Sequence, residues 1–217
     1  MLQRWQRASL NVTGSFECWM AASFDTKRGK ELRRLHKRLG EKGEFQTLSL
    51  AKNSEATPFN TEFMKLEVPG WKGDHGTALA NHGEWDPDTR EALATLHQRG
   101  KLRFWTMKLE GQPIASLFSF VDGSKTSLGK IAYDESFGRY LPGVLLVLDA
   151  TNSFFADGKI TEIDSSAIPI HPMIDRIWRK RITIADVLVA PAEVSASRFT
   201  ATVIAEKMRR TLRAALK

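Results

Sequence analysis

The sequence predicts an α+β fold with a central mixed sheet, mostly antiparallel, and helices on both faces. Three apolar strands follow one another through short glycine-containing turns, which is typical of an antiparallel meander. An apolar helix and another strand come next, and a helix that joins two neighbouring strands makes them parallel. A meander with one βαβ unit indicates a single layered domain. The predicted strands are 102–109, 114–121, 126–133 and 159–163, with turns at 110–112 and 122–124.

Amphipathic helices and one strand precede the meander. Three leucines recur at spacings of three and four within residues 26–40, so this segment forms a helix with one apolar stripe and basic residues around the rest. Asp86 suits an N-cap and Pro87 the first helical position, so a further helix begins there. The predicted elements of this half are the helices 26–40, 58–68 and 86–100 and the strand 44–50.

Helices and strands alternate after the meander. The helix 143–156 is apolar on all sides, so we expect it to be buried. The terminal helix carries Ile204, Met208 and Leu212 on one stripe and is expected to pack on the domain. The remaining predicted elements are a helix at 173–180 and a strand at 182–189.

Composition narrows the classes of function. The net charge of +7 is concentrated in residues 26–42, with +6, and 198–217, with +5, while the rest of the chain sums to −4. Two basic helices on a mildly acidic body are typical of solvated faces rather than of a track for nucleic acid. The chain has one cysteine, Cys18, and no apolar run near the roughly 20 residues of a membrane span, and its first residues do not predict a secretory signal. We therefore expect a cytoplasmic protein.

Residues 130–148 are the most informative stretch, because a strand runs there through a short turn into the apolar helix. The first N–H groups of a helix lack intrahelical partners and carry partial positive charge, which suits a diphosphate. Pro142 suits the first helical position, Gly143 allows a ligand to approach the backbone, and Arg139 adds positive charge. The stretch is equally compatible with an ordinary buried connection between a strand and a helix.

Five blocks of sequence, taken in order, resemble the GNAT acyl-CoA N-acyltransferase superfamily, and within it the branch typified by CelD-like proteins of bacterial cellulose biosynthesis. The blocks are GKELRRLHKRLGEKG, FMKLEVPGWKGDHGTALA, KLRFWTMKLEGQPIASLFSF, KIAYDESFGRYLPGVLLVLDAT and IDSSAIPIHPMIDRIWRKR. The resemblance implies a GNAT-like fold over residues 23–190, distant kinship to Fem-type aminoacyl transferases, and a sheet splayed where acetyl-CoA or another acyl-CoA enters. Residues 1–22 are then an N-terminal extension and 191–217 a C-terminal amphipathic basic helix. Many members carry a second GNAT-like half, so a homodimer or a partner GNAT-like domain is one expectation.

The resemblance also implies a donor site. The family's pyrophosphate loop, in which a basic or amide residue precedes a glycine-containing turn, falls on Arg139, Tyr140, Leu141, Pro142, Gly143 and Val144. The strand whose backbone pairs with the pantetheine arm and points an N–H at the thioester carbonyl falls on Ile131, Ala132 and Tyr133. The loop lacks the fuller glycine-rich form, so fewer N–H donors are expected.

Transfer from a thioester to an amine needs a base for the ammonium, stabilisation of the carbonyl oxygen and a proton for the leaving thiolate. Asp134 and Asp164 are candidate bases, since each ends one of the two parallel strands and both are expected at the same sheet edge. Asp164 alternatively bonds the backbone of the turn that follows it. His171 is a further titratable candidate or else a packed loop histidine, and Tyr133 either protonates the thiolate or belongs to the core.

The polar, glycine-rich block 67–76 is the candidate acceptor site, with a plain surface turn as the alternative. Arg179 or Arg181 is a candidate for contact with the 3′-phosphate of CoA. No metal site is expected, because the five histidines show no ligand-like pairing. The candidate acceptor residues are Glu67, Trp71, Lys72 and Asp74.

Together with the resemblance, these features predict an acyl-CoA-dependent N-acyltransferase, in particular an acetyltransferase. The expected acceptor is an amine of a small molecule or of a cell-envelope sugar, with a link to exopolysaccharide biosynthesis. Two alternatives stay open. One is a Fem-like transferase whose basic helices hold tRNA, and the other is a non-catalytic GNAT-like domain that helps to assemble an exopolysaccharide machine.

Overall fold

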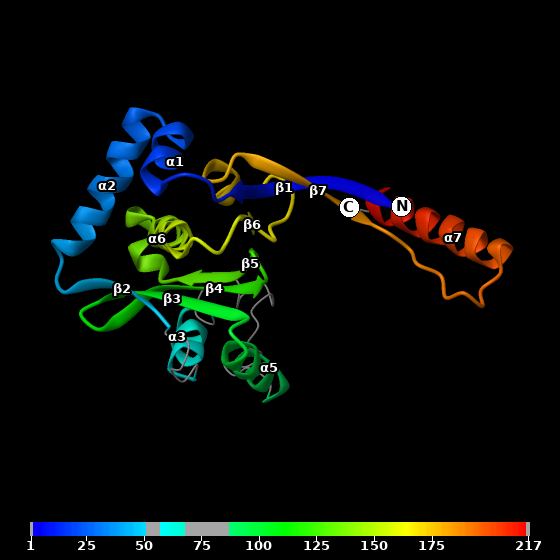
Figure 1. Ribbon diagram of the computed structural model, residues 1–217, viewed down its shortest axis with the longest axis horizontal. Coiled ribbons are helices and arrows are strands. Elements are labelled where there is room, and N and C mark those ends of the chain that lie inside the picture. Colours follow the sequence, from blue (N-terminus) through cyan, green and yellow to red (C-terminus); the bar gives the residue numbers. More distant parts are fainter. Residues whose placement is uncertain (1, 51–56, 68–86, 216–217) are drawn as a thin grey trace.

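A computed structural model describes residues 2–50, 57–67 and 87–215, which form a seven-stranded sheet flanked by helices (Figure 1). The strand order is β2-β3-β4-β5-β6-β1-β7, and every neighbouring pair is antiparallel except β5 and β6. The helices α1, α2 and α6 cover one face, and α3 and α5 cover the other (Figure 1). The predicted α+β fold with a mixed, mostly antiparallel sheet is confirmed.

The strands are β1 (Gln3–Asn11), β2 (Phe45–Ser49), β3 (Leu102–Leu109), β4 (Gln112–Asp122), β5 (Lys125–Tyr133), β6 (Glu162–Asp164) and β7 (Lys180–Asp186). The helices are α1 (Phe16–Ser23), α2 (Thr26–Gly40), α3 (Thr57–Glu67), α5 (Pro87–Gln98), α6 (Pro142–Asp157) and α7 (Ala196–Ala215).

The meander and the βαβ unit, on which the fold prediction depends, are both present. β3, β4 and β5 pair in sequence order through two short turns. β6 returns beside β5 in parallel after α6, with Ser127 opposite Asp164. Helix α6 is buried over most of its surface, as its all-round apolar sequence predicts.

Several segments differ from the prediction, among them residues 16–23, which form helix α1 where no helix was predicted. Residues 3–11 form β1, which lies between β6 and β7 in the sheet, although the local sequence pattern does not predict a strand there. The predicted helix at 173–180 is wrong: residues 174–176 form a single 3₁₀ turn and β7 begins at Lys180. Ile174, Ile177 and Trp178 are buried at helical spacing, but their burial comes from packing in the main core rather than from a regular helix.

A β-bulge in β5 shapes the core next to α6. Leu128 lies opposite Ser119 and Ile131 opposite Leu117, so two residues of β5 face one residue of β4. Because side chains alternate between faces, positions three apart would lie on opposite faces of a regular strand. The bulge turns Leu128 and Ile131 to the same core, under α6.

Helix α7 lies beside the outer ends of β1 and β7, apart from the helices that cover the sheet (Figure 1). Arg210 Nη1 donates a hydrogen bond of 2.5 Å to Asp186 Oδ2 at the end of β7. The stripe of Ile204, Met208 and Leu212 is 54%, 61% and 63% exposed, so these side chains do not pack on the domain. Within the described residues, no helix has both the length and the apolar character needed to cross a membrane.

Candidate active site

A cleft opens where β5 and β6 separate. The two strands pair only over Lys125–Ser127, and β5 then continues for six residues while the chain beyond β6 leaves the sheet. Asp134 N–H donates to Ile114 O in β4 at 2.9 Å. Backbone groups alternate in direction along a strand, so the N–H and C=O groups of Ala132 also face β4. The N–H and C=O groups of Ile131 and Tyr133 therefore point to the open side, away from β4. The cleft therefore has a strand edge along one wall.

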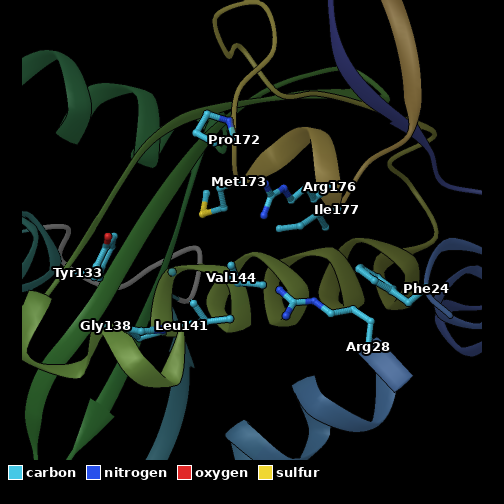
Figure 2. A pocket seen from close by; sticks show the side chains of 12 residues that line it. Phe24, Arg28, Tyr133, Gly138, Leu141, Val144, Pro172, Met173, Arg176 and Ile177 are labelled. Atoms are coloured by element: carbon cyan, nitrogen blue, oxygen red, sulfur yellow. The ribbon is translucent and has the colours of Figure 1, made fainter. Parts of the chain in front are cut away.

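Two adjoining cavities of about 270 Å³ and about 180 Å³ lie in this cleft, and Met173 lines both. The larger lies at the N-terminal end of α6, between β5 and the 3₁₀ turn at 174–176, with α2 approaching from the other side (Figure 2). The smaller lies along the bulged part of β5 and is closed by residues 165–167 and 171. The larger cavity is lined by Phe24, Arg28, Tyr133, Gly138, Leu141, Pro142, Gly143, Val144, Pro172, Met173, Arg176 and Ile177.

The N-terminus of α6 has no side-chain cap. Leu141 takes the left-handed conformation with φ 54° and ψ 48°, and its carbonyl oxygen accepts from the N–H groups of Val144 and Leu145. Pro142 has no N–H, and within the described residues the Gly143 N–H donates no hydrogen bond. An anion in the larger cavity would meet the positive end of the helix dipole there.

Glycine at position 143 also allows α6 to approach β5 closely. A Cβ atom there would lie 3.2 Å from Tyr133 Cδ1 and 3.5 Å from Ile131 Cδ1. Glycine was expected here because it lets a ligand approach the backbone, and the close packing of helix on strand is a second reason for it.

Two arginines from different elements reach the larger cavity (Figure 2). Arg28 comes from α2, where its Nη1 donates to Glu31 Oε2 at 2.7 Å, and Arg176 comes from the 3₁₀ turn. Neither arginine was predicted from the sequence as a site residue. Arg28 had a usable signal, because it precedes Leu32 by four residues and so lies on the buried leucine stripe of α2. A charged residue on such a stripe indicates a special environment. Arg176 had no comparable signal, since it lies in the wrongly predicted helix.

Arg139, predicted to strengthen the phosphate site, does not line either cavity. Its guanidinium is exposed and lies over the ring of Tyr140, 4.9 Å from the ring centroid. Lys42 approaches the same ring at 5.6 Å. A phosphate contact by Arg139 stays a prediction.

The two carboxylates expected at one sheet edge are far apart. Asp164 lies opposite Ser127, whereas Asp134 follows β5 seven residues later, which corresponds to about 20 Å along the strand. Asp134 accepts from Ser136 N–H at 2.9 Å. Asp164 accepts from Ser166 N–H at 2.9 Å, which is the turn contact expected as the alternative to a catalytic role, and it pairs with Arg7. Neither carboxylate lines either of the two cavities described above.

Tyr133 and His171 are the two predicted catalytic residues that the structure places in the cleft. Tyr133 lines the larger cavity and His171 the smaller one. His171 Nδ1 accepts hydrogen bonds from Met173 N–H and Ile174 N–H, both at 3.3 Å. In the neutral imidazole this leaves the N–H on Nε2, so His171 is arranged to donate a hydrogen bond from Nε2.

The proposed acceptor block is only partly described. Glu67, at the end of α3, is buried, and its Oε1 accepts from Lys130 Nζ at 2.8 Å. Trp71, Lys72 and Asp74 lie outside the described residues. Arg179, one candidate for the 3′-phosphate, donates from Nε to Ser23 O at 2.9 Å.

The other candidate for the 3′-phosphate also has partners within the protein. Arg181 Nη2 lies 3.3 Å from Asp175 Oδ2, and Arg181 Nη1 donates to the carbonyl oxygen of Trp178 at 2.8 Å. Arg179 and Arg181 thus make contacts within the protein that link the start of β7 to the end of α1 and to the 3₁₀ turn.

Asp149 fixes α6 against its neighbours. Its Oδ2 accepts from Thr47 Oγ1 at 2.6 Å and lies 3.9 Å from His36 Nε2, which joins α6 to β2 and α2. Burial raises the pKa of Asp149 above its ordinary value, and the hydrogen bond from Thr47 and the charge of His36 act in the opposite direction.

The chain has relatives among families and solved structures. Residues 26–168 match the family described as the acetyltransferase (GNAT) domain, and no curated protein matches the chain. FemX matches with a TM-score of 0.53 and 11% identity, over 82% of this chain and 59% of FemX. The C-terminal domain (DUF2156) of a protein named as a lysylphosphatidylglycerol synthetase from Agrobacterium fabrum matches with a TM-score of 0.52 and 11% identity, over 77% of this chain and 48% of that one. L-PGS from Bacillus licheniformis matches with a TM-score of 0.50 and 12% identity, over 78% and 49%. The chain thus spans about half the length of the latter two, and likeness at this identity shows a shared fold.

Proposed function

Because the chain belongs to the acetyltransferase (GNAT) domain family, we propose that it is an N-acyltransferase that takes an acyl group, in particular acetyl, from a CoA thioester. The proposed acceptor is an amine of a small molecule or of a cell-envelope sugar. The observation that carries the proposal is the larger cavity, which combines the uncapped start of α6 with Arg28 and Arg176.

The chemistry of the cavity suits the donor. A diphosphate needs N–H groups and positive charge, and both are available at the start of α6 and from the two arginines. The pantetheine arm is an extended chain with amide groups, and it is expected to follow the open side of β5 near Tyr133. The thioester would then lie toward the smaller cavity, beside His171.

The reaction requires few side chains. The acceptor nitrogen attacks the thioester carbon, the new C–N bond forms and the C–S bond breaks, and the proton lost by the amine balances the thiolate that leaves. The Tyr133 hydroxyl is the proposed proton donor to that thiolate, and His171 Nε2–H is proposed to stabilise the developing negative charge by donating a hydrogen bond. Holding the donor and the acceptor together in one cleft supplies much of the rate, of the order of 7–11 kcal/mol in favourable cases.

Calorimetric titration with acetyl-CoA tests the donor site. Arg28→Glu and Arg176→Glu should each weaken binding at least about tenfold, because a charge-assisted hydrogen bond contributes roughly 1.5–3 kcal/mol. Arg34→Glu is the matched control, since Arg34 is exposed on the same helix α2 as Arg28 and lines neither cavity. Equal affinity in all four proteins would contradict the proposal. Arg139→Glu in the same series tests the residue predicted from sequence.

Transfer from aminoacyl-tRNA is the second candidate function. The observation that favours it is the outer face of α2, which is exposed and basic and continues from Arg28 at the cavity. A gel-shift assay with tRNA at low and moderate salt separates the two, because binding through phosphates weakens steeply with salt. Turnover with acetyl-CoA and no tRNA shift would dismiss this candidate. Binding of neither would favour a non-catalytic role in assembly.

A further inference from the structure

Helix α7 has two apolar faces, and only one of them meets the rest of the protein. Phe199 and Val203 are half-buried on the face that also carries Arg210, the residue bonded to the end of β7. The second face is formed by Ile204, Met208 and Leu212, which recur every four residues. At about 100° per residue, the centre of this stripe lies almost opposite the face that contains Arg210. The three side chains of the stripe are each more than half exposed, although α7 lies beside the β1–β7 ribbon (Figure 1).

Basic side chains flank the exposed stripe on both sides. Arg198 lies near one edge of it and Lys207 near the other, and Arg213 lies farther round the helix, on the same side as Arg198. Within residues 2–50, 57–67 and 87–215 the structure records no ion pair for these three side chains. Glu206, the single acidic residue of α7, instead binds Arg209 and Arg210 at 2.6–2.8 Å. The helix therefore presents an apolar stripe flanked by positive charges that have no ion-pair partner within the described residues.

The positive charge of α7 favours a membrane surface over a second copy of the chain as the partner of the stripe. Five basic residues and one acidic residue give α7 a net charge of +4. A second copy of the chain packed on the stripe would bring the same positive charge alongside, which is repulsive. A surface of anionic phospholipid headgroups has the complementary charge, and the acyl region beneath it accepts the apolar side chains.

We propose that α7 binds the surface of an anionic phospholipid membrane, with its axis in the plane of the surface and Ile204, Met208 and Leu212 inserted below the headgroups. The arrangement needs no change in the fold, because the stripe is already exposed. This goes beyond the proposed acyl transfer and does not depend on it, since vesicle binding is measured without turnover. A transferase held in this way would meet acceptors at the membrane surface.

Co-sedimentation of the full chain with vesicles tests the proposal. The wild-type protein should bind vesicles of phosphatidylcholine with about a third phosphatidylglycerol and should bind pure phosphatidylcholine at least tenfold more weakly, because the attraction to anionic lipid is electrostatic. Replacing the stripe by glutamine should lower binding to the anionic vesicles at least tenfold. Glutamine is a good helix former and these positions are exposed, so the helix content by circular dichroism should not change. The stripe variant is Ile204→Gln/Met208→Gln/Leu212→Gln.

A charge variant and a matched control separate α7 from the net charge of the chain. Each basic side chain near an anionic surface contributes roughly a fivefold factor, so removing three from α7 should lower binding about a hundredfold. Removing three exposed basic residues from α2, whose outer face carries no apolar stripe, should lower it far less. The α7 variant is Arg198→Gln/Lys207→Gln/Arg213→Gln, and the α2 control is Lys27→Gln/Lys30→Gln/Arg38→Gln.

Three outcomes would overturn the proposal. One is equal binding to neutral and anionic vesicles, and another is equal loss in the α7 variant and the α2 control. The third is a wild-type dimer by light scattering that the stripe variant converts to a monomer, without vesicle binding by either protein. That last result would assign the stripe to self-association.

Discussion

Gly129→Ala tests the bulge of β5 and the packing around it. A Cβ atom at position 129 would lie 2.1 Å from Phe118 Cε2 and 2.4 Å from Phe118 Cδ2. Carbon atoms in contact are normally about 3.5–4.0 Å apart, so the ring would have to move by well over 1 Å. Phe118 is 3% exposed, and its ring centroid lies within 6 Å of those of Phe63, Phe104 and Phe120, so it has no free space to move into.

The cost of Gly129→Ala follows from this lack of space. Overpacking of a tight core usually costs about 1–3 kcal/mol, and a contact this short belongs at the upper end. For a chain of this length each 1 kcal/mol lowers the melting temperature by about 2–4 °C, so we expect a decrease of roughly 6–12 °C. Thermal and urea unfolding followed by circular dichroism measure it.

Gly40→Ala is the matched control. Gly40 ends helix α2 and a Cβ atom there would meet nothing within 4 Å, so the same substitution should stabilise by about 0.4–1 kcal/mol. A melting temperature of Gly129→Ala within about 1 °C of wild type would refute the placement of the Phe118 ring. So would strict additivity in a double-mutant cycle with Phe118→Ala, because removing the ring should relieve the clash.

Three further predictions concern α6, the α3 contact and the cleft. Asp149→Asn should stabilise the fold near neutral pH and progressively less toward about pH 4. The pKa of Asp149 is raised in the folded state, which favours its protonated carboxyl there. The stability that Asp149 contributes is therefore lost as pH rises through that pKa. Melting temperatures across this range check it, and a difference independent of pH would contradict it. Lys130→Met should cost about 3–5 kcal/mol in urea unfolding, since it removes a cation 2.8 Å from the fully buried Glu67 carboxylate, and Lys130→Met/Glu67→Leu should recover most of the loss. Tyr133→Phe and His171→Gln should each lower kcat of acetyl transfer about 10²-fold with little change in acetyl-CoA affinity, and unchanged kcat in either variant would remove that residue from the reaction.

The elements that depend on local signals were predicted well from the sequence. The glycine turns determine the meander of β3, β4 and β5, and the apolar helix between two strands determines the parallel pairing of β5 and β6. β1 was missed because its place in the sheet depends on partners more than 150 residues away, at 162–164 and 180–186. The helix expected at 173–180 was wrong because burial at helical spacing does not require a helix.

The candidate site likewise has features that local sequence predicts and features that only the tertiary structure establishes. The sequence by itself determined the strand, the turn and the start of α6, because proline, glycine and apolar spacing act within a few residues. Only the tertiary structure decided which side chains share the cleft, because register and packing bring together residues that are distant in the chain. Register separates Asp134 from Asp164, and packing brings Arg28 of α2 and Arg176 of the 3₁₀ turn to one cavity.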